Sequence, residues 1–203
     1  HKGVQSEDIE MSPALNVETV SSPAGLYYDK THTWAFMEKD GFVKVGVDDF
    51  LQHLTGTVTQ VKLKAAGEKV RKGEKIMTVM HEGKQLELYA PVSGTIKTQN
   101  ESLLINPSQI NTSPYEAGWV YQIEPTNWLR ETRFLFMADK FKTWLDDEFI
   151  RLKEFLANTA NRNTVAYEHI VMQDGGELTD NVLADLEPKV WEDFQTQFID
   201  ESK

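Results

Sequence analysis

A lysine beside a predicted hairpin tip is the residue of this chain best suited to hold a cofactor. In residues 80–94, Glu82 and Gly83 form a polar break between two apolar, strand-like runs, and Lys84 follows directly. Glycine accepts the positive φ of a primed hairpin turn, so the turn is expected at Glu82 and Gly83. A lysine on an exposed hairpin of a small all-β domain is typical of proteins with a swinging cofactor arm.

Composition restricts the classes of function. The 203 residues include 32 acidic and 21 basic side chains, for a net charge of −11, which argues against binding to nucleic acids or to anionic membranes. The absence of cysteine excludes disulfides and thiolate chemistry. No apolar run approaches the roughly 20 residues of a transmembrane helix. We therefore expect a cytoplasmic protein, although the chain starts at His1 and an upstream membrane anchor is left open.

No catalytic pattern is found. The five histidines lack metal-ligand spacing, and there is no Ser-His-Asp order, phosphate-binding glycine loop or dinucleotide fingerprint. The sequence therefore predicts that the chain is not an enzyme and holds no metal.

Residues 26–127 predict a mainly β domain. Many short runs of aromatic and β-branched residues are separated by Gly, Pro and Asn turns, which is typical of a barrel or sandwich. Asp48 is the expected N-cap of one short internal helix, and Gly56 closes it. The strands are expected at residues 27–28, 33–38, 42–47, 58–63 and 118–123.

The flanking regions differ from this β domain. Residues 1–25 are acidic and polar and predict a flexible leader. Residues 128–157 have apolar side chains at spacings of three or four, which predicts a long amphipathic helix. Residues 158–203 predict a small α/β or helical extension, with a strand at 165–172, a turn at 174–176 and helices at 179–186 and 188–199. Its apolar stripe of Val190, Trp191, Phe194 and Phe198 is either core or a groove for a partner.

Four motifs together resemble one known family. They are YDKTHTW at residues 28–34, VGVDDF at 45–50, YAPVSG at 89–94 and SPYEAGW at 113–119. In this order and spacing the chain resembles the H protein of the glycine cleavage system over roughly residues 26–150. The resemblance implies a barrel-sandwich hybrid of the lipoyl-domain type, with lipoate amide-linked to a lysine at a hairpin tip.

The chain departs from the family pattern at that lysine. The resemblance implies a modified lysine eight residues before the proline of the Pro-Val-Ser-Gly corner. Counting back from Pro91 places this position at Gly83, and the acidic residue usual three positions earlier is Met80. Lys84 comes one residue late, and a shift of one residue along a strand turns a side chain to the opposite face.

Two hypotheses follow from this departure. We favour an H-protein-like module without lipoate that acts as a protein-interaction or accessory subunit of a carrier-dependent enzyme system. The alternative is a functional lipoyl carrier of a glycine-cleavage-like system, modified on Lys84, that shuttles an aminomethyl or acyl group or electrons between enzymes. Under both hypotheses the partners are other proteins, namely glycine-cleavage-like or other lipoate-linked enzymes.

Overall fold

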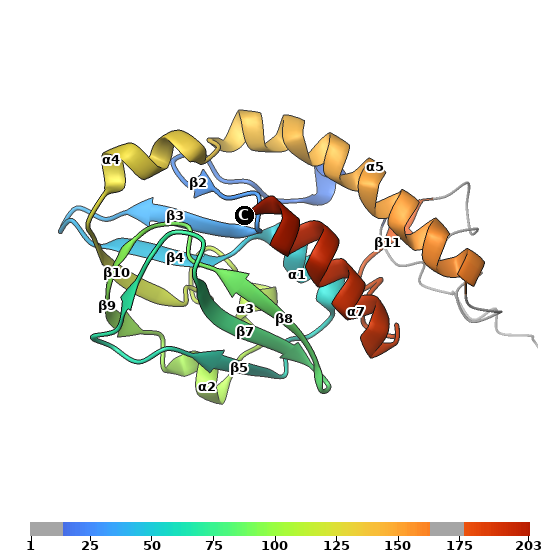
Figure 1. Ribbon diagram of the computed structural model, residues 1–203, viewed down its shortest axis with the longest axis horizontal. Coiled ribbons are helices and arrows are strands. Elements are labelled where there is room, and N and C mark those ends of the chain that lie inside the picture. Colours follow the sequence, from blue (N-terminus) through green and yellow to red (C-terminus); the bar gives the residue numbers. More distant parts are fainter. Residues whose placement is uncertain (1–13, 163–176) are drawn as a thin grey trace, which may run out of the picture.

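Two antiparallel sheets, which together we call the barrel, form the body of the protein (Figure 1). The computed structural model describes residues 14–162 and 177–203. The larger sheet has the strand order β2 (Tyr27–Tyr28), β3 (Thr33–Met37), β4 (Val43–Val47), β10 (Tyr121–Pro125), β9 (Gly94–Gln99) and β6 (Lys69–Val70). The smaller sheet has the order β5 (Gln60–Leu63), β7 (Lys75–His81) and β8 (Lys84–Tyr89). The predicted mainly β fold is confirmed.

Tyr121 joins the two sheets from within the core. Its buried hydroxyl donates to the carbonyl of Ile76 on β7 at 2.7 Å and accepts from the amide of Lys64 at 2.6 Å. A buried phenol needs such partners because an unpaired hydroxyl in the core would cost free energy. The apolar side chains of both sheets pack around it.

Three helices lie within this β region. The predicted internal helix is α1 (Asp49–Thr55), and its N-cap Asp48 accepts a hydrogen bond from the amide of Leu51 at 2.8 Å. The other two, α2 (Ser102–Ile105) and α3 (Gln109–Thr112), are single turns. Asn111 on α3 accepts from the amide of Val58 and donates to the carbonyl of Gly56, so α3 is tied to the end of α1.

The helical region after β10 consists of two parts, a short helix and a long one. The short α4 (Trp128–Glu131) and the 3₁₀ turn η2 (Thr132–Phe134) precede the long helix α5 (Ala138–Arg162). Phe136 interrupts the helical region because its backbone exchanges two hydrogen bonds with Tyr28, at 2.7 and 2.8 Å. From Ala138 on, α5 packs its apolar face on the barrel and runs past the predicted boundary at residue 157.

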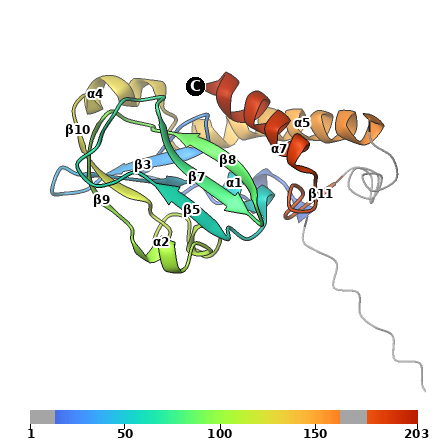
Figure 2. The same cartoon turned by 60° about the horizontal axis from the view of Figure 1, so that its bottom comes forward.

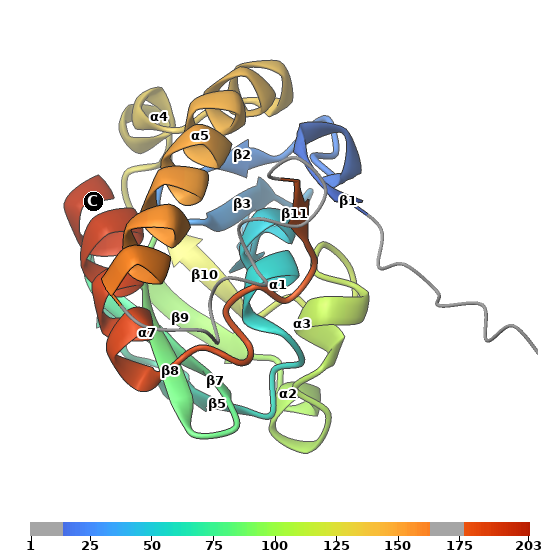
Figure 3. The same ribbon diagram turned by 90° about the vertical axis from the view of Figure 1, so that its right-hand side faces the viewer.

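The C-terminal segment, residues 177–203, returns to the barrel (Figure 3). Strand β11 (Leu178–Thr179) pairs with β1 (Ala14–Leu15), and the chain ends in α7 (Pro188–Phe194), the π-helical η3 (Gln195–Ile199) and the 3₁₀ turn η4 (Asp200–Ser202). The start of a helix at Pro188 is confirmed.

The predicted helix at 179–186 is wrong. The backbone there forms turns, with a positive φ of 65° at Asn181. The amides of Asn181 and Leu183 donate to the carbonyls of His53 and Leu54, at 2.7 and 2.9 Å. These carbonyls belong to the last turn of α1, where helical partners are missing, so long-range pairing outweighs the local helical pattern.

Part of the predicted leader makes specific contacts. The 3₁₀ turn η1 (Val17–Thr19) is capped by Asn16, and the amide of Ser21 donates to Asp49 at 2.7 Å. The first 13 residues, the predicted strand at 165–172 and the turn at 174–176 lie outside the described residues. Among the helices that the structure describes, none is long and apolar enough to cross a membrane.

A buried histidine links α5 to the barrel. The ring of His32, on the turn before β3, contacts Asp48 through Nδ1 at 2.8 Å and Glu148 of α5 through Nε2 at 3.0 Å, and all three side chains are buried. Burial alone would lower the pKa of His32, but the two carboxylates raise it to about 10. The ring is therefore a buried cation at neutral pH, and Arg151 pairs with the outer oxygen of Glu148.

We predict that replacing Glu148 with alanine strongly destabilises the protein. The substitution leaves a buried imidazolium with one carboxylate instead of two, and removing one partner of a buried ion pair costs about 3 to 5 kcal/mol. Urea unfolding followed by tryptophan fluorescence measures the change. The control is Glu154→Ala, at an exposed position of the same helix. Equal losses of stability in the two variants would contradict the role of the buried network.

Candidate functional site

The hairpin between β7 and β8 has a glycine at its tip. Glu82 and Gly83 have φ angles of 47° and 83°, and His81 pairs with Lys84 across the turn. Positive φ at both central residues is the pattern of a primed two-residue turn. A Cβ on Gly83 would meet no heavy atom within 4 Å, so the position has room for a side chain. The backbone conformation, rather than a lack of space, disfavours any residue with a Cβ there.

The side chain of Lys84 is held by the C-terminal segment. Its ammonium donates to the carbonyls of Ala184 and Leu186, the latter at 3.1 Å, and lies 5.6 Å from the ring centroid of Trp191. Trp191 is almost fully buried, and its indole N–H donates to the carbonyl of Leu183 at 2.8 Å. Lys84 therefore satisfies the carbonyls of a tight loop and adds a cation–π contact.

Further contacts fix the same segment along β8, and α7 lies beside this strand (Figure 2). The Gln195 carboxamide accepts from the amide of Glu87 at 2.8 Å and donates to its carbonyl at 2.9 Å. It therefore pairs with this edge strand as one residue of a neighbouring strand would. The hydroxyl of Tyr89 donates to Asp200. The edge of β8 is therefore occupied by the C-terminal segment.

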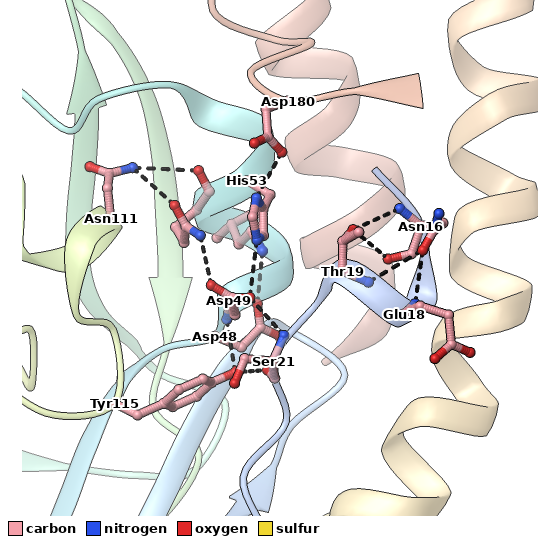
Figure 4. A network of polar contacts seen from close by, with 12 residues as sticks. Asn16, Glu18, Thr19, Ser21, Asp48, Asp49, His53, Asn111, Tyr115 and Asp180 are labelled. Atoms are coloured by element: carbon pink, nitrogen blue, oxygen red, sulfur yellow. Dashed lines mark hydrogen bonds and ion pairs between the residues drawn. The ribbon is translucent and has the colours of Figure 1, made fainter. Parts of the chain in front are cut away.

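A second polar network joins the segment to α1, and Figure 4 shows His53 between two carboxylates. Its Nε2 contacts Asp49 at 3.1 Å and its Nδ1 contacts Asp180 of the C-terminal segment at 2.8 Å. Burial alone would lower the pKa of His53, but the hydrogen bonds and charges of Asp49 and Asp180 raise it. Burial would raise the pKa of Asp49, yet His53 and the amide of Ser21 lower it. Protonated His53 therefore favours the docked segment.

The sequence located the hairpin turn but not the partners of its lysine. The carbonyls of Ala184 and Leu186 carry no sequence signal, because every residue has one. The apolar stripe that includes Trp191 was the available clue, and its two alternatives are now distinguished. All four residues of the stripe are buried, so the stripe is core. In the part of the chain that the structure describes, no three His, Cys, Asp or Glu side chains cluster as metal ligands.

The barrel region matches a known family. Residues 26–148 match the family model described as glycine cleavage H-protein. The chain belongs to the glycine cleavage H-protein family. A probable glycine cleavage system H protein of Pyrococcus abyssi is 40% identical over 121 residues, which are 60% of this chain and 90% of that protein. The glycine cleavage system H protein of Methylococcus capsulatus is 39% identical over 121 residues, 60% of this chain and 94% of that protein.

A solved structure is also similar. The crystal structure of a glycine cleavage system H protein from Mycobacterium marinum is 33% identical and covers 51% of this chain and 86% of that chain, with a TM-score of 0.49.

The residues that hold Lys84 lie outside the part of the chain that matches the H-protein family. Proteins of this family are non-catalytic lipoyl carriers, and the prediction that the chain is not an enzyme is thereby confirmed. The family match ends at Glu148. The groups that hold Lys84, in residues 184–191, therefore all lie outside the region shared with the H-protein family.

We predict that Lys84→Met loosens the C-terminal segment. Methionine keeps the apolar stem but removes the donor for two carbonyls. A loss of about 1 to 2 kcal/mol would lower the protection of the Asn181 and Leu183 amides against hydrogen exchange about 5- to 30-fold. The matched control is Lys62→Met, at an exposed position of β5 in the same sheet. Unchanged protection in Lys84→Met would show that the ammonium does not hold the segment.

We also predict that the docked segment loosens as the pH rises. The pKa of His53 is raised above its ordinary value of 6.5, so the stabilisation is complete below about pH 6.5 and is lost as the pH rises through the raised value. Hydrogen exchange of the Asn181 amide, corrected for its intrinsic pH dependence, measures the effect. His32 has a pKa of about 10, so it stays charged when the pH first rises above 6.5 and does not contribute to the effect there. His53→Gln is expected to abolish the dependence, and a dependence that survives in this variant would refute its assignment to His53.

Proposed function

We propose that this protein is an H-protein-like module that works without lipoate, as an interaction or accessory subunit of a carrier-dependent enzyme system. The proposal rests on one observation: residue 83 is a glycine, and the side chain of the following Lys84 is held by the C-terminal segment. Counting back from Pro91 predicts that Gly83 stands where the family has its attachment lysine. Gly83 has a φ of 83°, and the adjacent Lys84 is engaged by Ala184, Leu186 and Trp191. We expect no lipoate on this chain.

The chemistry of lipoylation supports this proposal. Amide formation needs a free, deprotonated amine that can enter the active site of an attaching enzyme. The amine of Lys84 would first have to leave two carbonyls and the face of Trp191. Acylation would then remove its charge and two of its donor hydrogens, and each buried carbonyl left unpaired costs about 1 to 3 kcal/mol. Modification and docking of the C-terminal segment therefore oppose each other.

The expected partners are proteins. Residues 26–148 keep the family framework, while the C-terminal segment covers the edge of β8 and presents a surface outside the family match. A subunit of this kind would dock on a lipoate-linked enzyme without delivering an arm to it. The cytoplasmic localisation stays a prediction.

The test is intact mass after co-expression with a lipoate-attaching enzyme. We expect the wild-type chain to remain unmodified under conditions in which a family member with the attachment lysine is fully lipoylated. Gly83→Lys restores a lysine at the family position, where there is room for a side chain. We expect this variant to gain one lipoyl group, because residue 83 is exposed at the tip of the hairpin. The positive φ makes the substitution strained, at a cost of about 1 to 2 kcal/mol. The double variant Gly83→Lys with Lys84→Met shows that the new lysine is the site.

One result would replace this proposal with the alternative function. A single lipoyl adduct on the wild-type chain that disappears in Lys84→Met would identify a working carrier modified on Lys84. The segment would then have to release its lysine before modification, and the adduct would appear together with faster hydrogen exchange in residues 177–203.

A further inference from the structure

A cavity of about 480 Å³ lies away from the hairpin tip, where distant parts of the chain meet. Its wall is formed by residues 29–31 before β3, residues 72–73 before β7, the end of β8 with Tyr89, the exposed Phe134 of η2, and the last two residues of the chain. This volume falls within the range of small-molecule sites. We propose that the cavity binds a small amphipathic anion, with a carboxylate or phosphate head and a short apolar chain.

The charge of the wall favours an anion. Three lysine side chains, those of Lys30, Lys72 and Lys203, contribute to the lining, against one acidic side chain, that of Asp29. Lys72 is paired with Asp29 at 2.6 Å, so these two charges offset each other. Lys30 and Lys203 have no carboxylate of a described side chain within 4.0 Å. In a chain with a net charge of −11, a local excess of positive charge attracts anions selectively.

The two free lysines already lie against aromatic rings. The ammonium of Lys30 is 5.6 Å from the ring centroid of Phe136, and that of Lys203 is 4.4 Å from the ring centroid of Tyr89. The nearby carboxylate of Asp200 accepts the hydrogen bond of the Tyr89 hydroxyl and one from Gln195. Neither ammonium is paired with a described side-chain carboxylate, so both keep donors for an anionic head group.

The hydroxyls of the wall are less useful to an anion. Thr31 donates its hydroxyl hydrogen to Asp29 at 3.0 Å, and Ser202 donates to the carbonyl of Phe198 at 3.2 Å. What remains on each oxygen is acceptor capacity, which an anionic head cannot use. Recognition of the head group therefore depends on lysine charges, and such binding weakens as salt is added.

An apolar wall favours a ligand with a tail. The side chain of Phe134, which lines the cavity, is 67% exposed, and Tyr89 and Ala90 also contribute to the wall. A large exposed aromatic side chain next to a cavity gains free energy when a hydrocarbon chain covers it, by about 0.8 kcal/mol for each buried CH₂. A head group near the lysines and a chain against Phe134 would use both features.

Titration of the isotope-labelled full chain, followed by backbone amide chemical shifts, tests the proposal. The probes are octanoate, octyl phosphate, octylammonium and inorganic phosphate. We expect saturable binding of octanoate and octyl phosphate, with shifts centred on Lys30, Gly73 and Ala90 and affinity that falls with salt. Inorganic phosphate lacks the chain and should bind more weakly than octyl phosphate.

Two variants and a matched control separate the head from the tail. Lys30→Gln should weaken octanoate binding about 3- to 10-fold, as expected for the loss of one charge-assisted contact. Phe134→Ser should weaken octanoate but leave inorganic phosphate unchanged. The control is Lys97→Gln, because Lys97 lies over Phe42 at 5.4 Å in the same way as Lys30 lies over Phe136. Equal binding of octylammonium, equal effects of Lys30→Gln and Lys97→Gln, or the absence of saturation would each overturn the proposal.

Discussion

The arrangement of the whole molecule depends on one buried cation. His32 lies on a turn of the barrel with a positive φ of 69°, and its ring is clamped between Asp48 and Glu148. Asp48 has a second task as the N-cap of α1, so one carboxylate orients both the histidine and the helix. Because unpaired charges are costly in the core, these groups allow only a narrow range of positions for α5. That helix then provides Phe155, which packs edge-on against Phe194 and Phe198 of the C-terminal segment.

Through these contacts, a region outside the family match reaches the hairpin between β7 and β8. α5 supports the C-terminal segment from one side, and α1 supports it from the other through backbone bonds to His53 and Leu54. The segment then engages Lys84 and the edge of β8. In a carrier, a hairpin tip must be free to enter the active sites of other enzymes. Here the tip itself is exposed, but the strand that leads away from it is part of a packed interface.

Local patterns in the sequence predicted the fold well. Alternating valines, turn glycines and the Asp48 cap all encode preferences that the backbone expresses within a few residues, and the corresponding strands and α1 are found in the structure. Long-range pairing decided the elements that were predicted less well. The backbone of Phe136 bonds to Tyr28, 108 positions earlier, and this bond interrupts the helical region. Residues 179–186 form turns because their amides pair with carbonyls of α1.

The candidate site also has one feature that the local sequence encodes and one that long-range contacts decide. The sequence by itself predicted that the attachment position holds Gly83, since counting from Pro91 needs only the register of one hairpin, and the primed turn at Glu82 and Gly83 suits a glycine. Only the tertiary structure decided the state of Lys84. Its partners lie 100 and 102 positions away and are backbone carbonyls, which no side-chain pattern can reveal. These carbonyls meet the lysine because apolar packing of Trp191 and its neighbours brings the C-terminal segment to β8. That packing depends on the positions of α1 and α5, which the local sequence of the segment does not set.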